Sequence, residues 1–158
     1  MSDQNLKALS RLVALVSEGY PFAAVQAKIK SSRLDLIAPQ GAHASVVAVL
    51  DQFRHAANLS RVQLVVVSTG RESEDLAASL RSMVEHAEIL EFPSWETLPH
   101  ERLSPRSDTI AKRIATLRSI EEATTPYIVV TPVRGFIHQF TKNLGHNQLQ
   151  TLEVGQEI

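Results

Sequence analysis

The stretch VQLVVVSTGRESEDLAASLRSM, residues 62–83, decides the fold class of this 158-residue chain. It begins with an almost unbroken run of aliphatic side chains, which is typical of a strand buried on both faces of a parallel sheet. Thr69 and Glu72 then form a capping-box pattern, in which a hydroxyl and a carboxylate satisfy free N–H groups where a helix begins. The helix continues with apolar residues at helical spacing, namely Leu76, Leu80 and Met83. A buried strand followed by an amphipathic helix indicates an α/β fold.

The same alternation extends to both sides of this unit. Short apolar runs at residues 34–38, 88–92 and 127–131 predict three further strands, and the 34–38 run is expected to be a buried strand that ends in a tight turn. Helices are expected over 46–57, from Asp108 onward and over 133–140. The second of these helices is expected to turn three residues inward, namely Ile110, Ile114 and Leu117. Thr131 is expected to cap the third helix, with Pro132 at its first position.

The chain divides into three parts on these patterns. Residues 1–32 predict a helical prefix of two amphipathic helices, separated by the Gly19-Tyr20-Pro21 break. Residues 33–148 carry the alternating strands and helices and form the predicted parallel-sheet subdomain. Residues 149–158 predict a strand and turn that begin a truncated next module.

The turn after the first predicted strand occupies the place where a phosphate-binding loop would lie. Such a loop reads G-x-x-x-x-G-K-[ST], with glycine N–H groups and a lysine facing phosphate and a hydroxyl holding magnesium. The aligned residues 38–45 read APQGAHAS. Ala38, His43 and Ala44 replace both glycines and the lysine, and only Ser45 fits, with Gly41 at an interior position. We therefore predict a degenerate loop without a nucleotide, and no acidic pair for magnesium follows either later strand.

Composition excludes several functional classes. The chain has no cysteine, so it has no disulfide, thiolate metal site or thiol nucleophile. Its formal charge of −1 gives no global attraction to nucleic acid or membrane. The six histidines show no spacing that would direct a pair at one metal ion, no GxSxG elbow marks a hydrolase, and no apolar run would span a bilayer. We expect a cytoplasmic protein, because the first residues do not form a signal peptide.

Two local features remain. Basic residues gather between residues 102 and 118, where they could contact DNA or an acidic partner: Arg102, Arg106, Lys112, Arg113 and Arg118. The preceding loop, residues 91–99, holds Phe92 and Trp95 between prolines, and these rings are expected to hold the loop against its own sheet.

That loop carries a family resemblance. Residues 92–108 read FPSWETLPHERLSPRSD and are followed by Arg113, Ile114 and Leu117, which resembles a long ungapped phrase near the N-terminus of the bacterial transcription-repair coupling factors, the Mfd family. The flanking stretches at residues 65–83, 127–140 and 152–158 resemble the same family, so the likeness covers about residues 34–158.

The resemblance implies a UvrB-like module with a RecA-like, P-loop-type sandwich fold that has lost its nucleotide site. It implies a large parent that uses ATP and magnesium to translocate on double-stranded DNA, removes stalled RNA polymerase and recruits UvrA. The motor lies beyond this chain, and the main UvrA surface lies in an insertion that starts near Gly155. The stretch from 92 to 107 is too short for the DNA-clamping hairpin of UvrB. No motor residue has a counterpart here, so the segment itself is expected to be a non-catalytic scaffold without cofactor.

Two other functions stay open at this stage. A small stand-alone enzyme could bind a nucleotide or phosphorylated ligand at the carboxyl edge of the sheet, using backbone N–H groups of residues 41–43. A DNA-binding module could instead use the basic residues of the 102–118 segment, with an affinity that falls steeply with salt.

Overall fold

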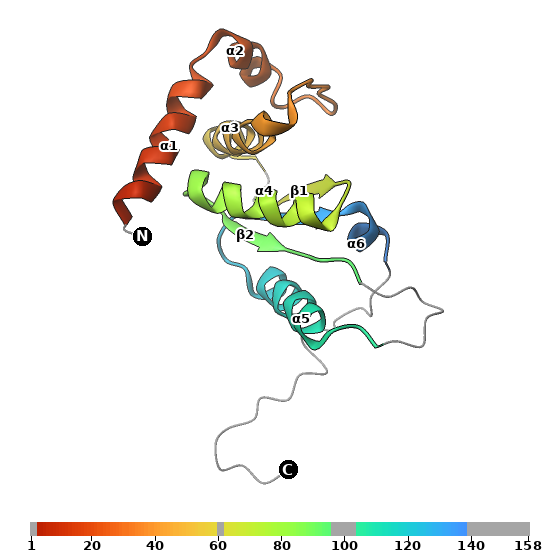
Figure 1. Cartoon of the computed structure of the whole chain (residues 1–158). Helices are drawn as coiled ribbons and strands as arrows, with labels where there is room; N and C mark the ends of the chain where they lie inside the picture. The colour runs from red at the N-terminus through yellow and green to blue at the C-terminus, as the bar shows by residue number, and fades with distance from the viewer. Residues whose placement is uncertain (1–2, 60–61, 96–103, 139–158) are drawn as a thin grey trace.

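The computed structural model describes residues 3–59, 62–95 and 104–138, except for the side chains of residues 3–8 and 20 (Figure 1). The chain order is α1 (Asp3–Ser17), α2 (Tyr20–Ala27), the 3₁₀ turn η1 (Gln40–Ala42), α3 (His43–Ala56), β1 (Val62–Val67), α4 (Gly70–Met83), β2 (Glu88–Glu91), α5 (Ser107–Glu122), β3 (Tyr127–Pro132) and α6 (Val133–Ile137). The predicted strand at 149–154 lies outside the described residues.

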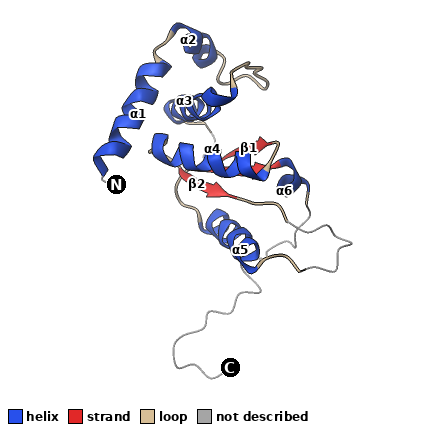
Figure 2. Cartoon of the chain, in the orientation of Figure 1, coloured by secondary structure: helices blue, strands red, loops and turns tan. Residues whose placement is uncertain are grey.

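The described strands form one three-stranded parallel sheet in the order β1-β3-β2. Tyr127 at the start of β3 pairs with Val62 on one side and with Glu88 on the other. Figure 2 shows α3 and α4 on one side of the sheet and α5 on the other. The prediction of an α/β fold built on a parallel sheet is therefore confirmed.

The main hydrophobic core lies between the sheet and the helices α3 and α4. Val49, Leu80, Ile128 and Val130 are fully buried there. The two prefix helices contribute to this core through Val13 and Val25, and Figure 1 shows α1 running beside α3 and α4. A smaller core lies under α5, and its buried members are Leu90, Phe92 and Val129.

The deciding stretch folds as its pattern predicts. Thr69 caps α4, and its Oγ1 accepts a hydrogen bond from the Glu72 N–H at 3.2 Å. The Glu72 carboxylate in turn accepts a hydrogen bond from the Ser68 N–H at 3.2 Å. The Thr69 hydroxyl therefore satisfies an N–H group that the first helical turn leaves free, and the Glu72 carboxylate satisfies the N–H of the residue before the cap.

The prediction of a strand at residues 34–38 is wrong. The backbone there has no regular structure, and Leu36 and Ile37 are exposed. An apolar run becomes a strand only where a second strand supplies its hydrogen bonds, and none of the three described strands pairs with this segment. The segment 38–45 is consequently an extended stretch, a 3₁₀ turn and a helix start, rather than a strand–turn–helix unit.

Two helix predictions also need correction. On α5 the buried side chains are Thr109, Arg113 and Thr116. Leu117 packs against the smaller core, as predicted, whereas Ile110 and Ile114 are only half-buried. The polar face packs against β2, where the Thr116 hydroxyl donates a hydrogen bond to the Glu91 carbonyl at 2.7 Å.

Helix α6 begins at Val133, as expected, but its cap differs from the prediction. Pro132 is its N-cap and also the last residue of β3, while the Thr131 hydroxyl is buried and donates to the Pro132 carbonyl at 3.2 Å. Thr131 therefore does not cap the helix. The helix ends at Ile137, and the predicted continuation over 139–140 lies outside the described residues.

Candidate functional site

The segment 38–45 retains only one feature of a phosphate site, a helix N-terminus. Helix α3 begins at His43 without a side-chain cap, after a turn in which the Ala42 N–H donates to the Pro39 carbonyl at 2.8 Å. A small hollow of about 170 Å³ beside the turn is also lined by two acids of α4, Glu72 and Asp75. A helix dipole supplies only about half a positive charge, and the two carboxylates oppose it.

The four members of the basic segment that the structure describes are not all exposed on one surface. Arg106 and Arg118 are exposed and form ion pairs, with Asp108 at 3.7 Å and with Glu122 at 2.8 Å. The hydrogen bond that Arg118 donates to the Glu122 carboxylate raises the pKa of Arg118. Lys112 is exposed on α5. Arg102 lies outside the described residues.

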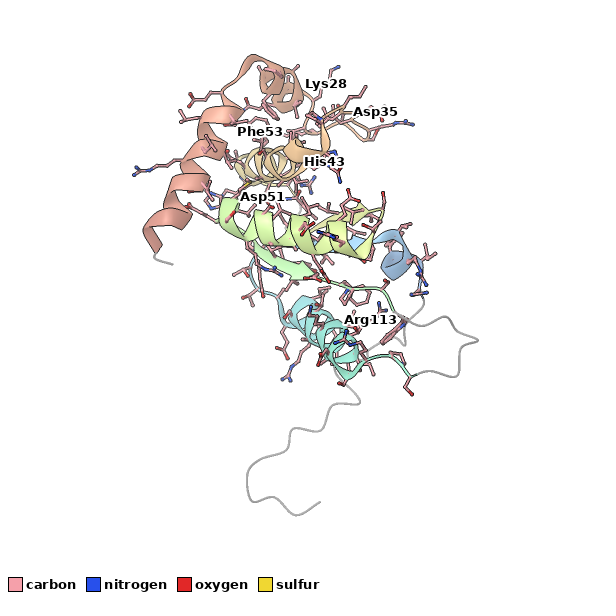
Figure 3. The ribbon with its side chains drawn as sticks, in the orientation of Figure 1. Lys28, Asp35, His43, Asp51, Phe53 and Arg113 are labelled. Atoms are coloured by element: carbon pink, nitrogen blue, oxygen red, sulfur yellow. The ribbon has the colours of Figure 1, made fainter. Side chains whose placement is uncertain are left out.

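Arg113 departs from the prediction, because it is 2% exposed. Its Nη1 donates to the Pro93 carbonyl at 2.6 Å. Its guanidinium carbon lies 4.0 Å from the centre of the Phe92 ring and 4.3 Å from that of Trp95. Figure 3 shows Arg113 on the side of α5 that faces this segment. Burial lowers the pKa of Arg113, so this cation is a packing residue and is not available on a DNA-binding surface.

These four residues, Phe92, Pro93, Trp95 and Arg113, form what we call the Arg113 clamp. The clamp fixes the chain leaving β2 to α5. The two rings were expected to hold the loop against the sheet: Phe92 does pack with Leu90 and Val129 of the sheet, whereas Trp95 lies against Arg113 of α5. Residues 96–99 of the loop lie outside the described residues. Helix α6 closes over the same segment: a Cβ on Gly135 would lie 2.6 Å from Thr131 Oγ1 and 3.1 Å from the Phe92 carbonyl oxygen. Only glycine fits this close approach without a shift of neighbouring atoms.

A crevice of about 710 Å³ lies at the carboxyl edge of the sheet, between the first turns of α4 and α5. Its lining mixes both charges, with Arg71 paired to Asp75 at 3.9 Å and Arg106 to Asp108. The Ser73 hydroxyl is buried at its wall and has no hydrogen-bond partner among the described residues. In the described ranges no group of three His, Asp or Glu residues is placed to hold a metal ion.

A second titratable cluster joins α3, β1 and the turn after α4. Asp51 is 7% exposed and accepts a hydrogen bond from Gln63 Nε2 at 2.6 Å. The rings of His55 and His86 stack with their centres 4.5 Å apart. Burial raises the pKa of Asp51, while His86, His55, Arg54 and Gln63 oppose that shift. Sequence reasoning missed this cluster, because its histidines come from separate elements that only the fold brings together.

Comparison with known proteins confirms the family resemblance. The chain is 40% identical over 134 residues to the transcription-repair-coupling factors of Mycobacterium bovis (strain ATCC BAA-935 / AF2122/97) and Mycobacterium tuberculosis (strain CDC 1551 / Oshkosh). Each match covers 81% of this chain and 10% of the relative, so the chain spans about a tenth of the length of these curated relatives. No family model matches the chain. Among the described residues, no helix combines the length and the apolar character that a membrane crossing needs.

Proposed function

We propose that this chain, whose sequence resembles part of the transcription-repair coupling factors, is a non-catalytic scaffold segment of such a factor and acts in transcription-coupled nucleotide excision repair. The observation that carries the proposal is the 40% identity over 134 residues. It is supported by the site itself, since residues 38–45 offer no lysine and face two carboxylates.

The finer fold assignment is part of the proposal. A UvrB-like, RecA-like sandwich with a degenerate phosphate loop is compatible with parallel strands joined by helices on both faces. The described sheet has three strands, so any further strand of such a sandwich would lie outside the described residues.

The activities of the parent remain proposals for regions outside this chain. They comprise an ATP- and magnesium-dependent translocase on double-stranded DNA, displacement of stalled RNA polymerase and recruitment of UvrA. The segment contributes a rigid platform that displays the insertion starting near Gly155 and docks against the other domains. The proposed role implies a cytoplasmic protein.

A matched pair of substitutions in the full-length parent tests the scaffold role. Leu80→Asp places a charge in the main core, whereas Ala78→Asp places the same charge on the exposed side of the same helix. The proposal predicts that Leu80→Asp slows repair of the transcribed strand to the rate found without the factor, while the purified protein still hydrolyses ATP. Ala78→Asp leaves both unchanged. Parallel loss of repair and ATP hydrolysis from Leu80→Asp would place this segment in the motor and contradict the proposal.

DNA binding by α5 is the second candidate, because Arg106, Lys112 and Arg118 are exposed. Two of the three are already paired with acids, which weakens the field that a phosphate backbone would meet. The double substitution Arg106→Glu and Lys112→Glu tests this candidate. If the variant bound DNA with the same affinity and the same salt dependence as the unsubstituted chain, these two residues would not be DNA contacts. The stand-alone enzyme would need the turn at residues 41–43 to hold a phosphate, and the hollow beside that turn is lined by the carboxylates of Glu72 and Asp75.

A further inference from the structure

Helix α1 exposes a row of leucines. Leu9 is 36% exposed, Leu12 is 51% exposed and Leu15 is 66% exposed. Because these residues recur at every third position, they lie along one side of the helix. Among the side chains that the structure describes, the other helices of eight residues or more, α2 to α5, keep every large apolar residue at least partly buried. We call the three residues the α1 leucine row.

The side of α1 that faces the rest of the molecule is more polar than the leucine row. Val13 is buried in the main core and Val16 packs against that core. Between them in the helical pattern, Ser10 and Ser17 are half-buried, and the Ser10 hydroxyl donates a hydrogen bond to the Glu85 carboxylate in the turn after α4. Figure 1 shows α3 and α4 on one side of α1 only. A surface helix normally turns its leucines to the core and its serines to solvent, so α1 has the arrangement of a helix that is also covered on its outer side.

The shape of the row indicates what would cover it. Along the row, α1 offers a partner only side chains, because its backbone groups there are bonded within the helix. The row rises about 9 Å from Leu9 to Leu15, and leucines so arranged form a ridge that fits a groove between the side chains of a second helix. Arg11 is exposed and stands one turn before Leu15, at the border of the row. An amphipathic helix with an acid beside its apolar stripe would match both features.

We propose that an amphipathic helix from elsewhere in the parent polypeptide, outside residues 1–158, packs along the α1 leucine row and places an acid opposite Arg11. The curated relatives have the required length of chain, since each match covers only 10% of the relative. A second copy of this chain fits less well, because a two-fold axis through Leu12, the middle of the row, would bring two Arg11 side chains together on one flank. This inference rests on the proposed function only in taking a coupling factor as the parent.

Amide hydrogen exchange in the 158-residue chain and in the full-length parent tests the proposal. The α1 amides are expected to exchange at least about tenfold more slowly in the parent, because opening of α1 there first requires release of the second helix. Leu12→Lys is expected to abolish this difference and to leave the unfolding midpoint of the short chain unchanged, since Leu12 is exposed there. Glu18→Lys is the matched control, because it places the same side chain at an exposed position directly after α1 and outside the row.

Photo-cross-linking identifies the occupant. A benzophenone side chain in place of Leu15 in the parent is expected to join α1 to a segment outside residues 1–158. Three results would overturn the proposal: equal exchange of α1 in the two proteins, cross-links confined to residues 1–158, or a dimer of the short chain that Leu12→Lys dissociates, which would make a second copy the occupant. Strand-specific repair is measured separately. A Leu12→Lys parent that loses the slow exchange but repairs normally would contradict the scaffold role and leave the docking assignment intact.

Discussion

Replacing Arg113 with alanine tests how the chain between β2 and α5 is held. The substitution removes a charge-assisted hydrogen bond to the Pro93 carbonyl, and such bonds contribute about 1.5–3 kcal/mol. It also removes two cation–π contacts, each of about 0.5–2 kcal/mol, and leaves a cavity between the Phe92 and Trp95 rings. The cost of burying the guanidinium offsets part of this sum. We expect a net loss of about 3 kcal/mol in the free energy of unfolding.

Urea unfolding followed by fluorescence measures this loss, because Trp95 is the only tryptophan in the chain and belongs to the clamp. Arg113→Met keeps the length of the side chain without the charge, and we expect it to cost about half as much as alanine. Arg118→Ala is the control, since it removes only an exposed ion pair on the same helix, and exposed pairs contribute little to stability. If Arg113→Ala and Arg118→Ala shifted the midpoint equally, the clamp would not stabilise the fold.

Three further substitutions probe other parts of the fold by the same unfolding assay. Thr69→Ala should cost about 1 kcal/mol through loss of the α4 cap, and Thr69→Ser should restore most of it; equal stabilities would contradict the capping role. Gly135→Ala should cost about 1–3 kcal/mol, because its Cβ meets Thr131 and the Phe92 carbonyl, and an unchanged midpoint would show that α6 moves freely. Asp51→Asn should reduce the dependence of the free energy of unfolding on pH. Burial raises the pKa of Asp51 above its ordinary 3.8, so the folded chain binds more protons than the unfolded chain and loses stability as pH rises from about 4 towards neutral. A wild-type chain that instead gained stability relative to Asp51→Asn over that range would refute this sign.

The sequence predicted the structure best where that structure depends on residues adjacent in the chain. The aliphatic run of β1 and the Thr69–Glu72 capping box are local signals, and both fold as expected. Residues 34–38 carry an equally apolar run, but a strand requires a partner that a local pattern cannot supply. The same dependence on partners explains why the stacked rings of His55 and His86 could not be predicted from their positions in the chain.

Arg113 shows a different limit of sequence reasoning. Counting basic residues assigned it to an exposed patch, although Thr109, Arg113 and Thr116 share one face of α5 at spacings of four and three. Two aromatic rings upstream, Phe92 and Trp95, supplied the surface that a buried guanidinium needs. Helical phase combined with these rings would have indicated burial, whereas charge alone did not.

The central claim is that residues 38–45 provide support and do not bind a nucleotide. Calorimetric titration of the 158-residue chain with ATP and magnesium tests it directly, with Ser45→Ala as the matched variant. Our account predicts no saturable heat up to millimolar nucleotide, in either protein. A micromolar dissociation constant that Ser45→Ala abolishes would contradict it.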